Sequence, residues 1–129
     1  MARILIVEDN PDNMKLFRAI LTMKGHVVTA LPSGDGLLEE LEAHPPDLVL
    51  MDIQLPGRDG FALLSEIRAS RFEGLRVVAL TAHAMSGDRE KAREAGFDEY
   101  ITKPIDIVTF PDLVARALAA GPNDRRGAL

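Results

Sequence analysis

The sequence contains no cysteine. Disulfide bonds, thiolate catalysis and cysteine-ligated zinc sites are therefore excluded. Long hydrophobic runs are also missing, since no window approaches the ~20 apolar residues that a membrane span needs. The apolar run near the N-terminus, residues 4–7, ends at Glu8 and is too short for a secretory signal. These absences favour a cytoplasmic protein without a membrane segment.

Basic residues are fewer than acidic residues in this sequence. The chain has 15 Lys and Arg residues against 20 Asp and Glu residues, a formal net charge of −5. Nucleic-acid binders generally present a basic face to the phosphates, so this balance argues against direct nucleic-acid binding, though not against a local patch. The 129 residues are 47% hydrophobic and 27% charged. Such a composition is typical of one ordinary folded domain that can bury its own core.

Short apolar runs alternate with helical patterns along the chain. The runs predict strands, several of them buried on both faces, at residues 4–7, 26–30, 47–51, 75–80 and 98–102. The segments that follow them predict helices at residues 11–24, 34–44, 61–68, 85–95 and 107–119. Five strand–helix repeats predict a doubly wound α/β fold, a parallel sheet with helices on both faces. We expect one domain over residues 1–120 and a flexible, frayed tail over residues 121–129.

Polar residues follow four of the predicted strands. Glu8 and Asp9 follow the first strand, Asp52 the third, Thr81 the fourth and Lys103 the fifth. Ligands bind beyond the carboxyl ends of the strands in open α/β sheets. We therefore expect these side chains to converge at one edge of the sheet.

This grouping has a chemical consequence. Three carboxylates held close repel one another, and a hard divalent cation relieves the repulsion. Mg2+ is the natural choice, because it binds through one or two carboxylates and keeps waters for a phosphate. A carboxylate nucleophile, Mg2+ and the ammonium of Lys103 together predict phosphoryl transfer. Each residue alone is more simply a turn, a cap or a solvated side chain, so the prediction depends on their joint occurrence.

Four stretches of the chain resemble the receiver domain of bacterial two-component response regulators, at residues 4–10, 47–57, 78–82 and 100–104. The resemblance extends from residue 3 to about residue 119 and implies the flavodoxin-like (βα)5 fold with a five-stranded parallel sheet. Residues 8–17 are similar to the single-domain DivK-type regulators. Very similar stretches also occur in the receiver domains of hybrid kinases.

The resemblance implies a role for each acidic residue. Asp52 matches the phospho-acceptor of the family. Asp9 matches the direct metal ligand, and Glu8 matches a second acidic position that acts through a water. The backbone carbonyl of Gln54 matches the third protein ligand. The implied cofactor is Mg2+, with Mn2+ able to take its place.

The switch residues are implied in the same way. Thr81 matches the hydroxyl that moves to the phosphoryl oxygen, helped by Lys103 and the backbone N–H of Ala82. Tyr100 matches the aromatic residue that rotates inward when Thr81 moves, although a half-exposed strand aromatic without a role is the alternative. The family resemblance also implies a cis peptide bond before Pro104.

Two features have more than one interpretation. His83 either blocks or orders the water that hydrolyses the acyl phosphate, or it simply faces solvent. The apolar arc of the helix at residues 11–24 is about 180° wide, more than the ~100° stripe that one core contact needs. Its edge, with Leu16, Ala19 and Met23, is either a docking strip for a helical partner or part of a well-buried helix.

The resemblance implies a signalling switch, not an enzyme with a separate substrate, although it catalyses its own phosphorylation and dephosphorylation. Its partners would be a histidine kinase or phosphotransfer protein and a downstream protein, and it would act as a monomer or a phosphorylation-dependent dimer.

A toprim or haloacid-dehalogenase-like enzyme would need an Asp-x-Asp pair after a strand, which residues 8–10 and 52–54 lack. A receiver cut from a hybrid kinase or multidomain regulator is the other alternative. The start at Met1 and the short tail favour a stand-alone protein.

Overall fold

The computed structural model describes residues 2–55, 57, 59–82 and 88–119. Its strands are β1 (Arg3–Val7), β2 (Val27–Leu31), β3 (Leu48–Asp52), β4 (Val77–Thr81) and β5 (Glu99–Thr102). Its helices are α1 (Pro11–Met23), α2 (Leu37–Ala43), α3 (Gly60–Arg68), α4 (Asp88–Ala95) and α5 (Phe110–Ala119). None of the described helices has the length and apolar character needed to span a bilayer.

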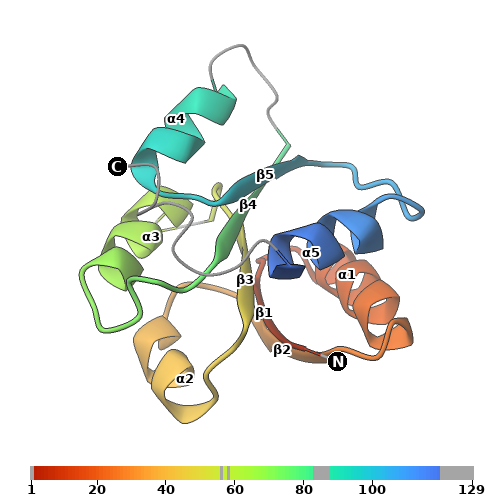
Figure 1. Cartoon of the computed structure of the whole chain (residues 1–129), viewed down its shortest axis with the longest axis horizontal. Coiled ribbons are helices and arrows are strands. Elements are labelled where there is room, and N and C mark those ends of the chain that lie inside the picture. The colour runs from red at the N-terminus through yellow and green to blue at the C-terminus, as the bar shows by residue number, and fades with distance from the viewer. Residues whose placement is uncertain (1, 56, 58, 83–87, 120–129) are drawn as a thin grey trace.

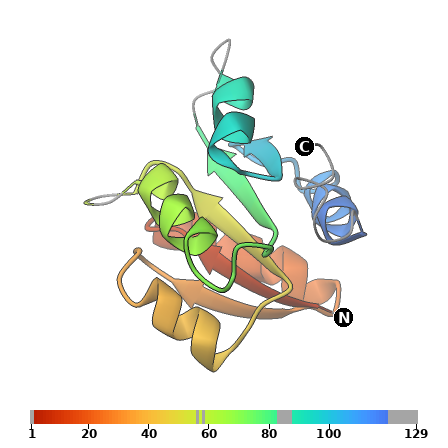
Figure 2. The same ribbon diagram turned by 60° about the vertical axis from the view of Figure 1, so that its left-hand side comes forward.

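The five strands form one parallel sheet in the order β2-β1-β3-β4-β5. Helices α2, α3 and α4 cover one face of this sheet, and α1 and α5 cover the other (Figures 1 and 2). The prediction of a doubly wound, flavodoxin-like fold is confirmed. The strand order reverses between β1 and β3, which is where such folds bind their ligands.

Side chains of the central strands alternate between two hydrophobic cores, because successive strand residues point to opposite faces. On β3, Val49 and Met51 join the core under α2, α3 and α4, and Leu48 and Leu50 join the core under α1 and α5. Every residue of β3 is buried, including Asp52 at its carboxyl end. The phospho-acceptor candidate is thus held at the end of a fully buried strand.

Helix α1 begins at Pro11, after Asn10, whose side chain accepts a hydrogen bond from the Asn13 N–H at 3.0 Å. This is the capping that the predicted helix start requires. The helix buries Phe17, Ile20 and Leu21, and the ring of Phe17 lies 5.5 Å from that of Phe110 in α5. These three residues form the core face of the helix.

Several element boundaries differ from the predicted ones. Helix α5 begins at Phe110 and not at Ile107, because the Asp106 carboxylate accepts hydrogen bonds from the backbone N–H groups of Val108 and Thr109 and holds them in a turn. Helix α2 begins after Gly36, which has a φ of 77°. His83, the predicted start of the helix at Met85, and the predicted tail at residues 121–129 lie outside the described residues.

Candidate functional site

Three carboxylates meet at the carboxyl ends of β1 and β3. Glu8 and Asp9 follow β1, Asp52 ends β3, and each offers an oxygen within 4.8 Å of those of the other two. The strands are direct neighbours in the sheet, so the predicted convergence of the three carboxylates occurs. Glu8 is 1% exposed and Asp52 is 3% exposed, whereas Asp9 faces solvent.

Lys103 reaches this acidic cluster from the end of β5. Its Nζ lies 2.7 Å from Oε1 of Glu8 and 3.0 Å from Oδ2 of Asp52. The backbone N–H of Lys103 donates to the Thr81 carbonyl at 2.7 Å, which fixes the lysine to the end of β4. The peptide bond between Lys103 and Pro104 is cis.

Two backbone donors complete the orientation of the buried carboxylates. The Asn10 N–H donates to Oε2 of Glu8 at 3.1 Å, and the Gln54 N–H donates to Oδ1 of Asp52 at 2.8 Å. Each of the four oxygens of Glu8 and Asp52 therefore accepts a hydrogen bond, from either Lys103 or a backbone N–H. A carboxylate oxygen has a second lone pair, so both carboxylates are held in place and can still bind a cation or attack an electrophile.

The electrostatics of the cluster depend on burial. Burial raises the pKa of Glu8 above its usual range, and the negative charge of Asp52 adds to this, although the hydrogen bond from Lys103 opposes it. Burial alone would lower the pKa of Lys103, but its hydrogen bonds to Glu8 and Asp52 outweigh that effect and raise it. The lysine is therefore a fixed cation at neutral pH.

The donor set fits a divalent cation. Three ionised carboxylates and one ammonium leave a formal charge of −2 at the cluster. All the side-chain ligands on offer are oxygens, which Mg2+ and Mn2+ prefer over softer metals. The residues present therefore match the metal that the sequence implies.

The remaining site candidates differ in their exposure to solvent. Thr81 ends β4 and is completely buried, and the next residue, Ala82, is exposed. Gln54 is exposed, two residues beyond Asp52. Tyr100 is 8% exposed and belongs to the core beneath α4. The ring is therefore already inward here, and the half-exposed position that the alternative interpretation gave it is not observed.

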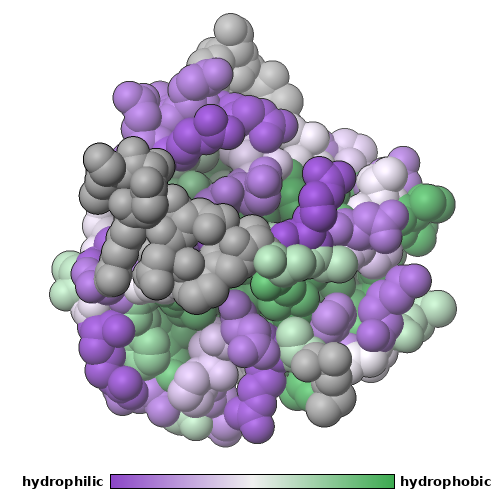
Figure 3. All heavy atoms as spheres, in the orientation of Figure 1, coloured by the Kyte–Doolittle hydropathy of each residue, from purple (hydrophilic) through white to green (hydrophobic). Residues whose placement is uncertain are grey.

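The candidate docking strip of α1 faces solvent. Leu16 is 39% exposed, Met23 is 86% exposed, and Ala19 between them is also exposed. This edge is therefore not buried between the sheet and a neighbouring helix, as the alternative interpretation of a well-buried helix would require. Ile107 and Val108, in the loop between β5 and α5, are exposed as well, and Figure 3 shows this hydrophobic tip at the right-hand edge of the molecule.

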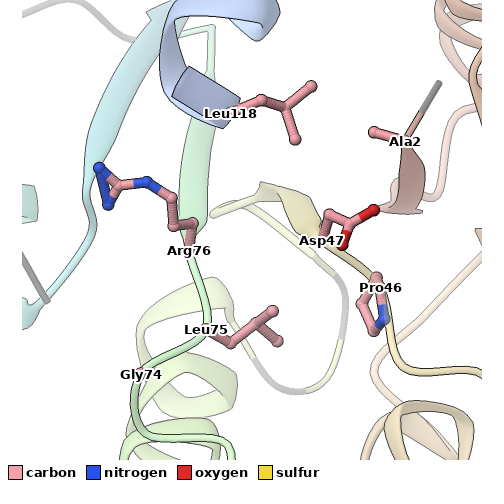
Figure 4. Close-up of a pocket in the computed structure, with 7 residues that line it drawn as sticks. All are labelled: Ala2, Pro46, Asp47, Gly74, Leu75, Arg76 and Leu118. Carbon is pink, nitrogen blue, oxygen red and sulfur yellow. The ribbon is translucent and has the colours of Figure 1, made fainter. Parts of the chain in front are cut away.

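A cavity of about 460 Å³ lies at the opposite end of the sheet (Figure 4). Asp47, Leu75, Arg76 and Leu118 are among its lining residues. The Arg76 guanidinium is already engaged, since it donates to the Ala117 carbonyl at 2.8 Å and pairs with Asp98. Because ligands of open α/β sheets bind beyond the carboxyl ends of the strands, we place the functional site at the acidic cluster and not at this cavity.

The profile of the response regulator receiver domain family matches residues 4–115. The chain belongs to this family. Among similar receiver proteins, the polar-differentiation response regulator DivK of Brucella ovis is 39% identical over 112 residues, which cover 86% of this chain and 91% of the relative. An uncharacterised 14.6 kDa protein of Leptolyngbya boryana is 38% identical over 122 residues, covering 94% and 93% of the two chains.

Solved receiver structures share the fold. The receiver domain of a sensor histidine kinase from Pseudomonas aeruginosa, which holds a magnesium ion in its active-site cleft, gives a TM-score of 0.83 at 35% identity over 92% of this chain and 98% of that one. A response regulator structure from Chloroflexus aurantiacus gives a TM-score of 0.85 at 28% identity, with the same coverage. The receiver fold therefore extends over nearly the whole chain.

Sequence reasoning missed three features of this receiver domain. It paired Lys103 with the phosphoryl group and not with Glu8, the closer of its two partners here. It did not identify the backbone donors that hold the carboxylates. It also missed the guanidinium of Arg89, which lies 5.1 Å from the centroid of the Tyr100 ring. No spacing in the sequence signals these contacts, because each depends on side-chain positions between separate elements.

Proposed function

We propose that this receiver domain is a phosphorylation switch in which Asp52 accepts a phosphoryl group, with Mg2+, from a histidine kinase or phosphotransfer protein. The observation that carries the proposal is the position of the Asp52 carboxylate. It ends a fully buried strand, 3.0 Å from the ammonium of Lys103 and beside the carboxylates of Glu8 and Asp9.

The chemistry follows from this arrangement. An oxygen of Asp52 forms the new bond to phosphorus, while the bond from phosphorus to the donor imidazole breaks and its electron pair returns to the ring. Lys103 neutralises charge on the phosphoryl oxygens. Asp9, Asp52 and the Gln54 carbonyl would hold Mg2+, with Glu8 acting through a water. When bound, the metal supplies further positive charge to the transferring group.

Switching requires more than one contact with the phosphoryl group. About 5.5 kcal/mol is needed to move an equilibrium from mostly off to mostly on, and a hydroxyl contact to a charged group supplies only ~1.5–3 kcal/mol. Thr81 therefore acts together with Lys103 and the backbone N–H of Ala82. We place the output on the face formed by α4, β5 and α5, where Tyr100 lies.

The test of the acceptor is direct. The wild type and Asp52→Asn are incubated with acetyl phosphate and Mg2+, and the intact mass is measured. We expect the wild type to gain one phosphoryl group and Asp52→Asn to gain none. Asp35→Asn, which changes an exposed aspartate in the loop before α2, is the matched control. Equal phosphorylation of Asp52→Asn would show that another residue is the acceptor.

The exposed strip of Leu16, Ala19 and Met23 is the proposed docking surface for the donor. The exposed cations Lys15 and Arg18 lie on the same helix. A groove of about 400 Å³, lined in part by these two cations and by Met14, extends from α1 to Glu8 and Asp9. A donor helix with an apolar stripe and acidic flanks would therefore fit α1 and reach the acidic cluster.

A comparison of two donors tests this docking surface. Leu16→Ser should lower kcat/KM for phosphotransfer from the cognate histidine kinase about tenfold, the effect of losing one buried apolar contact. Its rate with acetyl phosphate should not change, because a small donor needs no docking surface. Val27→Ser, at an exposed apolar residue of β2, is the control. A kinase-dependent rate equal to that of the wild type would remove Leu16 from the docking surface.

We further propose that the domain acts as a stand-alone regulator. The alignment with DivK covers 91% of that relative's length, which supports this proposal over a receiver module of a hybrid kinase. Mass spectrometry of the protein purified from its host tests the point. A mass near 14.1 kDa is expected, and a much larger one would favour the hybrid-kinase alternative.

A further inference from the structure

Helix α4 has a weaker hydrophobic attachment to the sheet than α1 and α3. Helix α3 buries Leu63, Leu64 and Ile67, and α1 also buries three apolar side chains. Of the α4 side chains that the structure describes, residues 89–95, only Ala92 is buried. With so little apolar contact, the position of α4 depends strongly on each remaining contact with the sheet.

One such contact joins Arg89 to Tyr100. The guanidinium carbon of Arg89 lies 5.1 Å from the centroid of the Tyr100 ring. This distance is within the ~6 Å over which a cation attracts the face of an aromatic ring. Tyr100 is buried and Arg89 is exposed, so the guanidinium covers the ring on the side toward solvent.

The Tyr100 ring also lies close to Thr81, the residue through which the acidic cluster would affect α4 and β5. Tyr100 pairs in register with Ala79 of β4, and Thr81 ends that strand two residues later. A displacement at the end of β4 is therefore passed to the neighbouring β5, which carries the ring. Through Arg89, a change in the ring also changes the attachment of α4.

We propose that Arg89 is a positioning residue that ties α4 to the Tyr100 ring, so that burial of the ring and docking of α4 change together. Its role in signalling rests on the proposed phosphorylation of Asp52, but the tie itself does not. Under this proposal, the contact is made or broken as one unit, which is the kind of element that coupling between sites requires. Without Arg89, the ring and the helix would be coupled less tightly, through the core that Ala92 and Tyr100 share.

The composition of the chain makes the ring easy to follow. Tyr100 is the single tyrosine and there is no tryptophan, so tyrosine fluorescence reports this residue alone. Acrylamide quenches the ring when it is exposed. In metal-free buffer, we expect Arg89→Ala to raise the quenching constant about two- to fivefold, the population change that an exposed cation–π contact gives.

Two further variants serve as controls for this quenching measurement. Lys91→Ala removes an exposed cation from the same helix and should leave quenching unchanged. Arg89→Lys keeps the charge but loses the planar group that stacks on a ring, so it should fall between the wild type and Arg89→Ala. Quenching in Arg89→Ala equal to that in Lys91→Ala would overturn the proposal.

Hydrogen exchange of the α4 amides tests the coupling. In Arg89→Ala, these amides should exchange about two- to fivefold faster than in the wild type, because loss of the cation–π contact raises the population of the undocked helix by that factor. With beryllofluoride and Mg2+, the quenching of Tyr100 and the exchange of α4 should change together in the wild type and less closely in Arg89→Ala. A wild type that does not respond contradicts the proposed phosphorylation, and the metal-free comparison still decides the role of Arg89. Unchanged α4 exchange in metal-free Arg89→Ala overturns the coupling.

Discussion

Lys103 is the residue on which the charge balance of the site depends. Its ammonium is the counter-charge of both Glu8 and Asp52, and its side chain is only 13% exposed. Removing the ammonium leaves two buried carboxylates to repel each other. The high pKa of Glu8, which follows from its burial, limits the cost because this group can take up a proton.

We therefore predict that Lys103→Met lowers the free energy of unfolding in metal-free buffer by about 1–3 kcal/mol, the cost of leaving charged groups without their hydrogen bond. Mg2+ should recover part of this loss, because it binds the folded state and supplies positive charge. Urea unfolding with EDTA and with Mg2+ measures both effects. Lys91→Met, at an exposed lysine, is the control. A variant as stable as the wild type in EDTA would show that Lys103 does not balance the cluster.

Asp9 differs from its acidic neighbours because it is exposed. We predict that Asp9→Ala weakens Mg2+ binding by about tenfold or more, since even groups outside the ligand shell change metal affinity 10–100-fold. The metal-free variant should be at least as stable as the wild type, because one repelling carboxylate is removed. Mg2+ titration and urea unfolding measure the two effects. Unchanged Mg2+ affinity would exclude Asp9 as a ligand.

His26 gives a prediction about pH. Its Nδ1 accepts a hydrogen bond from the Ala2 N–H at 3.2 Å, and burial, followed by the N-terminal charge, lowers its pKa. Between the lowered pKa of the folded state and about 6.5, the unfolded state binds more protons, so stability falls as pH falls through this window. His26→Asn keeps an acceptor but does not titrate. Its free energy of unfolding should therefore fall less than that of the wild type from about pH 8 to about pH 5, and equal losses would contradict the assignment.

At the scale of elements, the sequence predicted all five strands and five helices because the apolar runs and the helical patterns are long and distinct. It also predicted that Glu8, Asp9, Asp52 and Lys103 meet, because they follow strands of one parallel sheet. The start of α5 was missed because the Asp106 side chain competes with the helix for backbone N–H groups. The contact between Arg89 and Tyr100 could not be predicted, because it depends on the docking of one helix against one strand.

The junction between β3 and α3 depends on Gly60. A Cβ at this position would lie 2.6 Å from the Cα of Ile53 and 2.9 Å from the Asp52 carbonyl. We predict that Gly60→Ala lowers stability by about 1–3 kcal/mol, as overpacking does, and slows phosphorylation because it displaces Asp52. Gly36→Ala meets no atom within 4 Å but has a φ of 77°, so it should cost stability without affecting phosphorylation. Chemical unfolding and acetyl phosphate kinetics separate the two effects.

At the scale of the whole molecule, stability and chemistry lie at opposite ends of the sheet. Near the amino ends of β4 and β5, the buried carboxylate of Asp98 pairs with Arg68 at 3.1 Å and Arg76 at 3.5 Å, and accepts from the Val77 N–H at 2.8 Å. Arg68 also donates to the Gly96 carbonyl, and Arg76 to that of Ala117. One carboxylate thus links α3, the loop before β5, and α5.

We predict that Asp98→Ala lowers the free energy of unfolding by about 3–5 kcal/mol, because it leaves the buried guanidinium of Arg76 and the partly buried one of Arg68 without their counter-charge. Mg2+ affinity of the folded protein should stay within about twofold of the wild type, since distant sites behave independently. Chemical unfolding and Mg2+ titration at low temperature measure the two quantities. A large loss of Mg2+ affinity in the folded variant would show that the two ends are coupled.

The pairing of Lys103 with Glu8 joins residues 95 positions apart in the chain. During synthesis, the carboxylates of β1 and β3 leave the ribosome well before the lysine that neutralises them. Under the proposed function, an unfinished or truncated chain has the acceptor but lacks the cation that the reaction needs. Such a chain would not be phosphorylated, and it would not compete with finished copies for phosphoryl groups. Under this proposal, the domain becomes able to accept a phosphoryl group only when the residue after its last strand is in place.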